Sequence, residues 1–467
     1  MSEIARIVSP VDGSIYAERT YLSPDQAREA VKKAASAQQD WQETPLEERL
    51  QILNRAVDIL GEQSAELAGE LAWQMGRPIS QGAGEVRGFT ERARFMLDIA
   101  PKALAPIETA DKPGFKRYIR RDPVGVVLII APWNFPYMTA VNSAWPALAA
   151  GNSVLLKHAQ QTLLCAERME RVLKAAGLPE GVFQTLHMDH QTTADMLKEP
   201  AIRFVNFTGS VRGGQSIQEA VAASGNFAGT GLELGGKDPA YVRADADIQD
   251  AAINLADGAF FNTGQSCCSI ERIYVHESVY KPFLEALVAE TRKLVLGNPL
   301  EAGTSLGPLV KTAAAEFVRG QIKEALQAGA EALIDPADFP ADREGTPYMA
   351  PQILVNVNHS MRVMTEESFG PVVGVMSVSS DEEAVELMND CEFGLSASIW
   401  TRDLAVAERL GQKVKTGTLF MNRCDYLDPA LVWTGVKNTG RGGSLSELGY
   451  DALTQPKSFH LRLPTGA

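Results

Sequence analysis

The chain has few cysteines and few histidines, and neither type is spaced as in metal sites or disulfide frameworks. It contains five cysteines and six histidines among 467 residues. An odd and sparse set of cysteines in a long chain indicates a reducing compartment, so we expect a cytoplasmic location. Because His-x-x-x-His and Cys-x-x-Cys patterns are absent, we expect no metal site. His187 and His190 are interpreted as loop residues.

Basic residues are outnumbered, and long apolar runs are absent. The chain has 44 lysines and arginines against 58 aspartates and glutamates, a formal net charge of −14. This charge argues against nucleic acid or an anionic membrane surface as a partner. No segment reaches the roughly 18 apolar residues of a membrane span, and the first residues do not resemble a secretory signal. With 45% hydrophobic residues, the composition is typical of a soluble globular protein with two or three domains.

Short apolar strands alternate with helical segments over most of the chain. Before this alternation, periodicity predicts helices over 24–39, 47–75 and 81–104. Ser23 is the expected N-cap of the first helix, with Pro24 at its first position. The alternation begins with strands expected at 124–131, 153–157, 182–185 and 202–206. The helices between them are expected at 136–150 and 162–176.

The alternation resumes beyond residue 235. Strands are expected near 272–275, 352–355 and 372–377, and helices near 251–260, 279–294, 312–328 and 381–388. Strands that alternate with helices of this length favour a parallel, doubly wound sheet. We therefore predict an α/β fold with two such domains. The basic segment 116–121 and the tail 457–463 alternate as edge strands do.

Two adjacent cysteines follow a Gly-Gln pair in the stretch Phe260 to Arg272. Cys267 comes 34 residues after Glu233 (267 − 233), which lies in Leu-Glu-Leu-Gly-Gly-Lys. A cysteine thiolate can act as a nucleophile, and a carboxylate can then activate water against the acyl-enzyme. Taken alone, each segment has a simpler interpretation, because a cysteine is more often a small apolar core residue. A lone Glu before Gly-Gly is equally compatible with a solvated strand end.

Three further segments join strands to helices or loops. Asn134, in Pro-Trp-Asn-Phe-Pro, can donate a side-chain N–H to an oxyanion, although such an Asn often only forms a turn. Gly209 and Ser210 follow an expected strand and open a helix whose free N–H groups suit phosphate. Alone this is a weak signal, since it departs from Gly-x-Gly-x-x-Gly. Glu367 and Phe369 lie in Glu-x-Phe-Gly-Pro, otherwise interpreted as an acidic loop.

Together these segments resemble the signatures of the aldehyde dehydrogenase superfamily. Gly-Gln-x-Cys with an Arg five residues on and Glu-Leu-Gly-Gly-Lys both occur here, as does a C-terminal Gly-Val-Lys-x-x-Gly-Arg-Gly from Gly435. The resemblance covers nearly the whole chain. It implies a Rossmann-like doubly wound cofactor domain, a second α/β catalytic domain and a small β oligomerisation element. Their expected boundaries are 1–105 with 125–233, then 234–445, and 106–124 with 446–467.

The resemblance implies a mechanism in which an aldehyde is oxidised to its carboxylic acid. Cys267 would be the nucleophile, Asn134 and the Cys267 N–H would hold the oxyanion, and Glu233 would activate the hydrolytic water. Cys268 would be structural. The presence of Glu233 favours hydrolysis over acyl transfer to coenzyme A. Non-catalytic, structural use of the fold is the alternative from a different class.

The resemblance also implies a cofactor site for NAD or NADP. Many NAD-preferring members carry Glu three residues after the lysine at Lys157, whereas this chain has Gln160. Loss of that charge relaxes the discrimination against a 2′-phosphate, so we predict use of both cofactors. The residues expected around the cofactor are Trp133, Lys157, Gln160, Gly209, Ser210, Gly214, Leu234, Glu367 and Phe369.

Substrate choice rests on fewer residues. Arg423 favours a semialdehyde such as succinate semialdehyde, whereas Asp425 favours a cationic aminoaldehyde, and both are also compatible with surface positions. His158, in Lys-His-Ala, is similar to bacterial succinate-semialdehyde-type enzymes, while a broad aliphatic or aromatic specificity is the alternative. Tyr137 and Met138 are expected in a tunnel wall. The basic strand and the alternating tail imply a homodimer or homotetramer.

Overall fold

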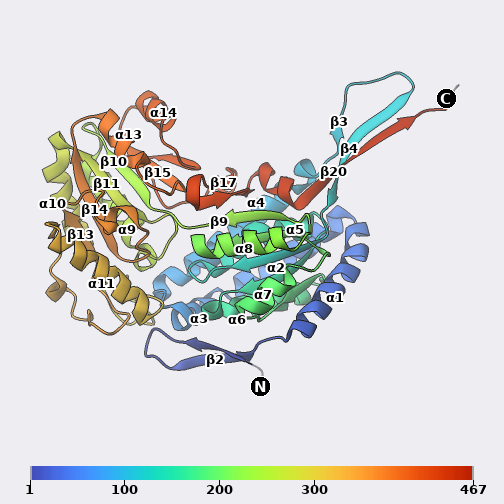
Figure 1. Ribbon diagram of the computed structural model, residues 1–467, viewed down its shortest axis with the longest axis horizontal. Coiled ribbons are helices and arrows are strands. Elements are labelled where there is room, and N and C mark those ends of the chain that lie inside the picture. The colour runs from blue at the N-terminus through green and yellow to red at the C-terminus, as the bar shows by residue number, and fades with distance from the viewer. Residues whose placement is uncertain (1–2, 465–467) are drawn as a thin grey trace.

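Two mainly parallel sheets form the body of the protein, and a small antiparallel sheet projects from it (Figure 1). A computed structural model describes residues 3–464. The α/β class predicted from the alternating pattern is confirmed. Within residues 3–464, no helix has the length and apolarity required to cross a membrane.

The first sheet has six strands in the order β18-β9-β8-β5-β6-β7. Its central strand β5 reads Val-Val-Leu-Ile-Ile-Ala and is buried along its whole length, as expected for a parallel strand covered on both faces. The strands are β5 (Val126–Ala131), β6 (Ser153–His158), β7 (Phe183–Thr185), β8 (Ile202–Thr208), β9 (Gly229–Glu233) and β18 (Gly440–Arg441). Only β18, which pairs with β9, is antiparallel. This strand falls inside the range 234–445 that was predicted for the other domain.

Within residues 3–233, the structure has eight α-helices. They are α1 (Pro24–Glu43), α2 (Leu46–Glu62), α3 (Ser64–Met75), α4 (Ile79–Ala103), α5 (Pro136–Ala149), α6 (Leu163–Ala175), α7 (His190–Met196) and α8 (Val211–Ala223). The predicted cap of α1 is confirmed, because Ser23 Oγ accepts from the Gln26 N–H at 3.3 Å.

Two predictions in this region are wrong. The single helix expected over 47–75 is two helices, because the backbone of Gln63 (ψ 7°) departs from helical geometry between α2 and α3. His190 is not a loop residue. It begins α7, which forms because the Asp189 carboxylate caps the Thr192 N–H at 2.6 Å.

The second sheet has seven strands in the order β12-β13-β14-β11-β10-β15-β16, and only β12 is antiparallel to its neighbour. The strands are β10 (Asp238–Val242), β11 (Ile270–His276), β12 (Glu331–Ala332), β13 (Gln352–Val355), β14 (Val372–Val378), β15 (Ser396–Trp400) and β16 (Thr418–Met421). The associated helices are α9 (Ile248–Phe260), α10 (Tyr280–Thr291), α11 (Thr312–Gln327), α12 (Arg362–Thr365), α13 (Asp381–Asn389) and α14 (Leu404–Gly411).

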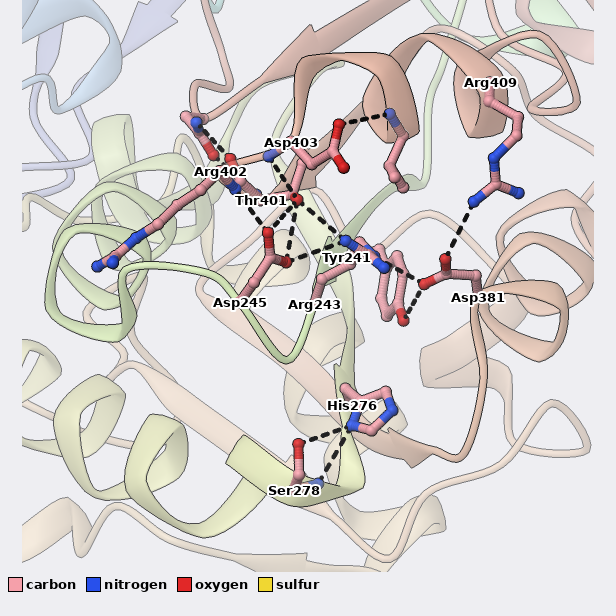
Figure 2. Close-up of polar contacts among 12 residues, drawn as sticks. Tyr241, Arg243, Asp245, His276, Ser278, Asp381, Thr401, Arg402, Asp403 and Arg409 are labelled. Atoms are coloured by element: carbon pink, nitrogen blue, oxygen red, sulfur yellow. Dashed lines mark hydrogen bonds and ion pairs between the residues drawn. The ribbon is translucent and has the colours of Figure 1, made fainter.

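The sequence motifs lie at the carboxyl ends of strands in the first sheet but at the amino ends of strands in the second sheet. Asn134 and Glu233 lie at the carboxyl ends of β5 and β9, whereas Cys267 and Phe369 precede β11 and β14. At the other end of the second sheet, Figure 2 shows a polar network centred on Arg243, which follows β10. Arg243 Nε donates to Asp381 Oδ1 at 2.8 Å and Arg243 Nη1 to Asp245 Oδ1 at 3.1 Å. This network ties β10 to the start of α13, far along the strands from Cys267.

The projecting sheet has the order β20-β4-β3 and stands clear of the body (Figure 1). Its strands are β3 (Ile107–Glu108), β4 (Phe115–Pro123) and β20 (Thr454–Arg462). β4 and β20 pair antiparallel over nine residues, from Phe115 opposite Arg462 to Pro123 opposite Thr454. The strands predicted over 116–121 and in the tail are confirmed. β20 lies at an edge as expected, whereas β4 lies between β20 and β3 and is therefore not an edge strand. Two further two-stranded antiparallel sheets pair β1 (Ile4–Val8) with β2 (Ile15–Thr20) and β17 (Trp433–Thr434) with β19 (Gly443–Ser444).

Candidate active site

The cysteine pair lies in a loop with unusual backbone geometry between α9 and β11. Asn262 and Thr263 have φ values of 52° and 59°, a left-handed conformation that is unfavourable for a β-branched residue such as Thr. Side chains hold this conformation: Thr263 Oγ1 donates to the Gly307 carbonyl at 3.0 Å, and Asn262 Nδ2 donates to the Gln265 carbonyl at 3.1 Å. The loop therefore presents Cys267, which is only partly buried, from a fixed backbone.

The glycines after Glu233 bring its segment against this loop. A Cβ atom at Gly236 would lie 2.0 Å from the carbonyl oxygen of Cys267, so no larger residue fits there. The two segments that are 34 residues apart in sequence (267 − 233) therefore lie side by side, with Glu233 at the end of β9.

Asn134 reaches the same loop from the first sheet. Its Nδ2 donates to the Gln265 carbonyl at 3.2 Å, two residues before Cys267. An amide nitrogen carries two hydrogens, so one N–H remains for another acceptor. Asn134 is 5% exposed and is thus enclosed beside the Cys267 segment.

A buried ion pair that sequence reasoning missed supports the Asn134 turn. Arg77 and Glu85 pair with almost no exposure. Arg77 also donates to the Asn134 carbonyl and, through Nε, to Asn262 Oδ1 at 3.2 Å. Glu85 Oε1 accepts the N–H groups of Tyr137 and Met138 at 2.9 and 3.0 Å, which caps the start of α5. One pair therefore positions both the Asn134 turn and the cysteine loop.

We expect Glu85→Ala to destabilise the protein by about 3–5 kcal/mol, because it leaves the Arg77 charge buried and unpaired. Urea unfolding followed by fluorescence would measure the change. Arg94→Met is the matched control: Arg94 pairs with Asp58 at the surface, so its loss should cost about 1 kcal/mol or less. Equal effects of the two substitutions would contradict the role assigned to the buried pair.

Glu233 is held by two hydroxyl groups. Ser444 Oγ donates to Oε1 at 2.6 Å and Thr208 Oγ1 to Oε2 at 3.3 Å. Burial raises the pKa of the Glu233 carboxyl above its usual value, and these hydrogen bonds oppose that shift. A raised pKa suits a general base that works near neutral pH. Thr208 and Ser444 carried no sequence signal, because both are ordinary hydroxyl residues far from Glu233 along the chain.

The second cysteine faces a carboxyl group. Cys268 Sγ donates to Asp425 Oδ1 at 2.9 Å, and Ser266 Oγ contacts the same oxygen at 3.3 Å. The neighbouring Cys267 thiol and burial raise the pKa of Cys268 well above its usual value, and burial raises the pKa of Asp425 to about 7. These contacts give Cys268 a structural environment.

Several residues that the sequence predicts around the cofactor lie at the carboxyl ends of β6, β8 and β9. Ser210 Oγ caps α8 by accepting the Gly213 N–H at 3.2 Å, and a Cβ atom at Gly209 would lie 2.7 Å from the Phe207 ring. A Cβ atom at Gly214 would lie 2.6 Å from Leu234, so these two predicted residues pack on each other. The bare backbone at the start of a thirteen-residue helix fits a pyrophosphate group.

Lys157 is buried and Glu367 is half-buried, and each has a shifted pKa. Burial lowers the pKa of Lys157, whose Nζ has only one long hydrogen bond, to the His158 carbonyl at 3.5 Å. Burial likewise raises the pKa of Glu367 to about 8, and the carboxyl accepts the Gly236 N–H at 2.9 Å. The rings of Trp133 and Phe369 meet edge to face at 5.6 Å. An amine with no counter-ion among residues 3–464, a half-buried carboxyl and an aromatic pair are suited to a ribose and a flat heterocycle.

Gln160 was expected to contact the cofactor ribose, but its amide is hydrogen-bonded within the protein. Its Nε2 donates to the Arg6 carbonyl at 3.0 Å, and its Oε1 accepts from the Tyr21 hydroxyl at 3.2 Å. Both polar groups of its amide are thus occupied by the β1–β2 hairpin and the residue after it. Among residues 3–464, no cluster of three or more His, Cys, Asp or Glu side chains is arranged to hold a metal ion.

Comparisons with known proteins agree with these motifs. Residues 2–459 match the model of the aldehyde dehydrogenase family. A protein of Paenarthrobacter nicotinovorans named aldehyde dehydrogenase is 36% identical over 430 residues, which cover 91% of this chain and 93% of that protein. The chain belongs to the aldehyde dehydrogenase family. The family resemblance seen in the sequence is confirmed.

Two further proteins are similar to this aldehyde dehydrogenase over nearly its whole length. Sad of Escherichia coli K12, named succinate semialdehyde dehydrogenase [NAD(P)+], is 33% identical over 442 residues, which cover 95% of this chain and 94% of that protein. The structure of an NAD-dependent aldehyde dehydrogenase from Sinorhizobium meliloti superposes with a TM-score of 0.94 at 32% identity. That comparison covers 100% of this chain and 92% of the other. The predicted aldehyde dehydrogenase fold is thereby confirmed.

The residues expected around the substrate of this aldehyde dehydrogenase lie in different environments. The Tyr137 prediction is wrong, because the side chain has no exposed surface and packs edge-on to Phe89 with ring centroids 6.5 Å apart. Asp425 does not present a free carboxylate, because Cys268 and Ser266 contact it. Arg423 is exposed, with its guanidinium 3.5 Å from the centre of the Tyr426 ring. Met138 packs over α4, where its Sδ would lie 2.1 Å from a Cβ atom at Gly88.

Proposed function

We propose that this aldehyde dehydrogenase oxidises an aldehyde to the carboxylic acid through a thioester on Cys267, with NAD or NADP as the hydride acceptor. The observation that carries the proposal is the convergence of Cys267, Asn134 and Glu233 from three separate segments. Cys267 is the partly exposed cysteine of the pair, Asn134 keeps a free N–H beside it, and Glu233 has a raised pKa.

The mechanism follows from these side chains. The Cys267 thiolate attacks the aldehyde carbon, and the oxyanion that forms accepts from Asn134 Nδ2 and the Cys267 N–H. Hydride loss from this carbon to a bound nicotinamide would convert the thiohemiacetal into a thioester as the oxyanion collapses to a carbonyl. Glu233 then leaves Ser444 and Thr208 to take a proton from water, which attacks the thioester carbon. The acid departs and the Cys267 thiol is restored.

For the substrate we propose an aldehyde that carries a carboxylate, such as succinate semialdehyde. The E. coli relative with that name supports the proposal. A cationic aminoaldehyde is less favoured, because Asp425 contacts Cys268. A broad aliphatic or aromatic specificity remains the alternative.

We further propose that the β3-β4-β20 sheet pairs subunits in a homodimer or homotetramer. We also propose that the enzyme is cytoplasmic, where its five free cysteines would stay reduced.

Cofactor reduction at 340 nm tests the function and the cofactor choice together. Both NAD and NADP should support turnover, and Gln160→Glu should lower kcat/KM for NADP about tenfold or more through charge repulsion. Gln160→Asn is the neutral control. Absence of turnover with NADP at saturating aldehyde would exclude dual use, whereas absence of turnover with either cofactor across acidic, amino, aliphatic and aromatic aldehydes would exclude the proposed function.

A further inference from the structure

Arg92, on α4, is a buried cation without a counter-ion in contact. Its side chain is nine-tenths buried, with 8% exposure. Nη1 donates to the Met138 carbonyl at 2.9 Å and lies 3.4 Å from Asn142 Oδ1. Across residues 3–464, no carboxylate lies within 4 Å of the guanidinium. Burying a charge without a paired anion is costly, so an anionic ligand would relieve that cost.

The free edge of this guanidinium has the geometry that binds an oxyanion. Both hydrogen bonds of Arg92 use Nη1, which leaves Nε and Nη2 without a partner among the described residues. Nε and Nη2 each retain some solvent-accessible surface, so neither is sealed off from a ligand. Nε–H and one Nη2–H of an arginine point in parallel and match the two oxygens of a carboxylate.

The position of Arg92 links it to the catalytic groups. Met138 and Asn142 lie on α5, directly after the Asn134 turn. The carboxylates of Glu85, Glu91 and Glu233 and the Cys268 thiol are near enough to act on the charge of Arg92, and Arg92 acts in turn on Asp425.

Each of the four carboxyl groups near Arg92 already has another partner. Glu85 pairs with Arg77, and Glu91 accepts from the Tyr426 hydroxyl at 2.8 Å. Glu233 accepts from Ser444, and Asp425 accepts from Cys268. Arg92 is therefore a cation close to Cys268 and Glu233 whose donors are not committed to a carboxylate of the described chain.

We propose that Arg92 determines specificity by binding the anionic group of the aldehyde substrate, a carboxylate in the first instance, while Cys267 attacks the aldehyde carbon. This inference rests on the proposed function and names the residue that selects the substrate. Arg92 replaces Arg423 in that role. A solvent-exposed guanidinium stacked on Tyr426 gains less from an anion than a buried one, because water competes for its donors and screens its charge.

Steady-state kinetics with succinic semialdehyde and butanal, an uncharged aldehyde of the same carbon count, would test the proposal. We expect Arg92→Met to raise KM for succinic semialdehyde at least about 30-fold and to change KM and kcat for butanal less than about threefold. Arg92→Lys, which keeps the charge but loses the two-pronged geometry, should lie between. Arg94→Met on the same helix and Arg423→Met are the matched controls and should leave the ratio of the two KM values unchanged.

A purely structural role would change both substrates alike, because Arg92 would then only join α4 to α5 through the Met138 carbonyl. Equal losses for the two aldehydes, or a larger loss of selectivity in Arg423→Met than in Arg92→Met, would overturn the inference. Thermal shifts provide a readout without turnover: succinate should raise the Tm of the wild type more than butyrate does, and Arg92→Met should lose that difference. Equal shifts by the two acids in the wild type would also overturn it.

The two proposals can fail separately. If the wild type oxidises butanal but gains nothing from the carboxylate of succinic semialdehyde, the Arg92 inference is wrong and the proposed function stands. If neither aldehyde is oxidised while succinate still raises the Tm in an Arg92-dependent manner, the anion site stands and the proposed function is wrong.

Discussion

Cys267→Ala should abolish aldehyde-dependent reduction of the cofactor, with a loss of at least about 10⁴-fold in kcat/KM. The proposed chemistry passes through a covalent bond to this sulfur, and alanine offers no atom for it. Absorbance at 340 nm with each aldehyde measures the loss, and an unchanged Tm would show that the fold is retained.

The adjacent cysteine is the matched control for this prediction. Cys268→Ala should lose less than about tenfold, because its thiol donates to Asp425 and has a pKa well above the usual value. Comparable losses in both variants would not identify which cysteine is the nucleophile. A loss in Cys268→Ala alone would show that Cys268, and not Cys267, is the nucleophile.

Glu233→Gln should separate the two halves of the reaction. We expect a burst of reduced cofactor of one equivalent per active site, followed by a steady rate lower by about 10²–10⁴-fold, since the amide cannot take a proton from water. Stopped-flow absorbance at 340 nm resolves the two phases. A wild-type steady rate in this variant would rule out Glu233 as the deacylating base.

The pH dependence of the same step follows from the raised pKa of Glu233. A general base works as the carboxylate, so deacylation in the wild type should slow as the pH falls through that pKa. In Glu233→Gln this acidic limb should disappear from the slow phase. A limb of the same shape in both proteins would place the titrating group elsewhere.

The sequence predicted the parts of the fold whose causes are local or periodic. Apolar runs such as Val126–Ala131 identify buried parallel strands, and Ser23 with Pro24 identifies a helix start. The break at Gln63 was missed because neither Pro nor Gly stands at that position, and the start of α7 was missed although Asp189 caps it.

The candidate site was predictable only where residues form a continuous motif. Cys267, Asn134 and Glu233 each lie in such a motif. Arg77, Glu85, Arg92 and Ser444 do not, and their roles arise from partners that are brought together by tertiary packing. Tyr137 lies next to the Asn134 motif in sequence and was therefore expected in the wall of the substrate tunnel. Helix α5 instead directs this side chain into the core.

The supports of Cys267 are spread along almost the whole chain, and this has a consequence for folding kinetics. Arg77 must reach Asn134 and Asn262, and Ser444, on a strand near the C-terminus, must reach Glu233. Contacts between such distant segments form late, because closing long loops is slow and entropically unfavourable. During synthesis, Cys267, the proposed nucleophile, would therefore leave the ribosome well before Ser444, which holds the proposed base Glu233. A nascent chain would carry the Cys267 thiol before the contact between Ser444 and Glu233 could form. On refolding, activity should therefore return later than helical structure.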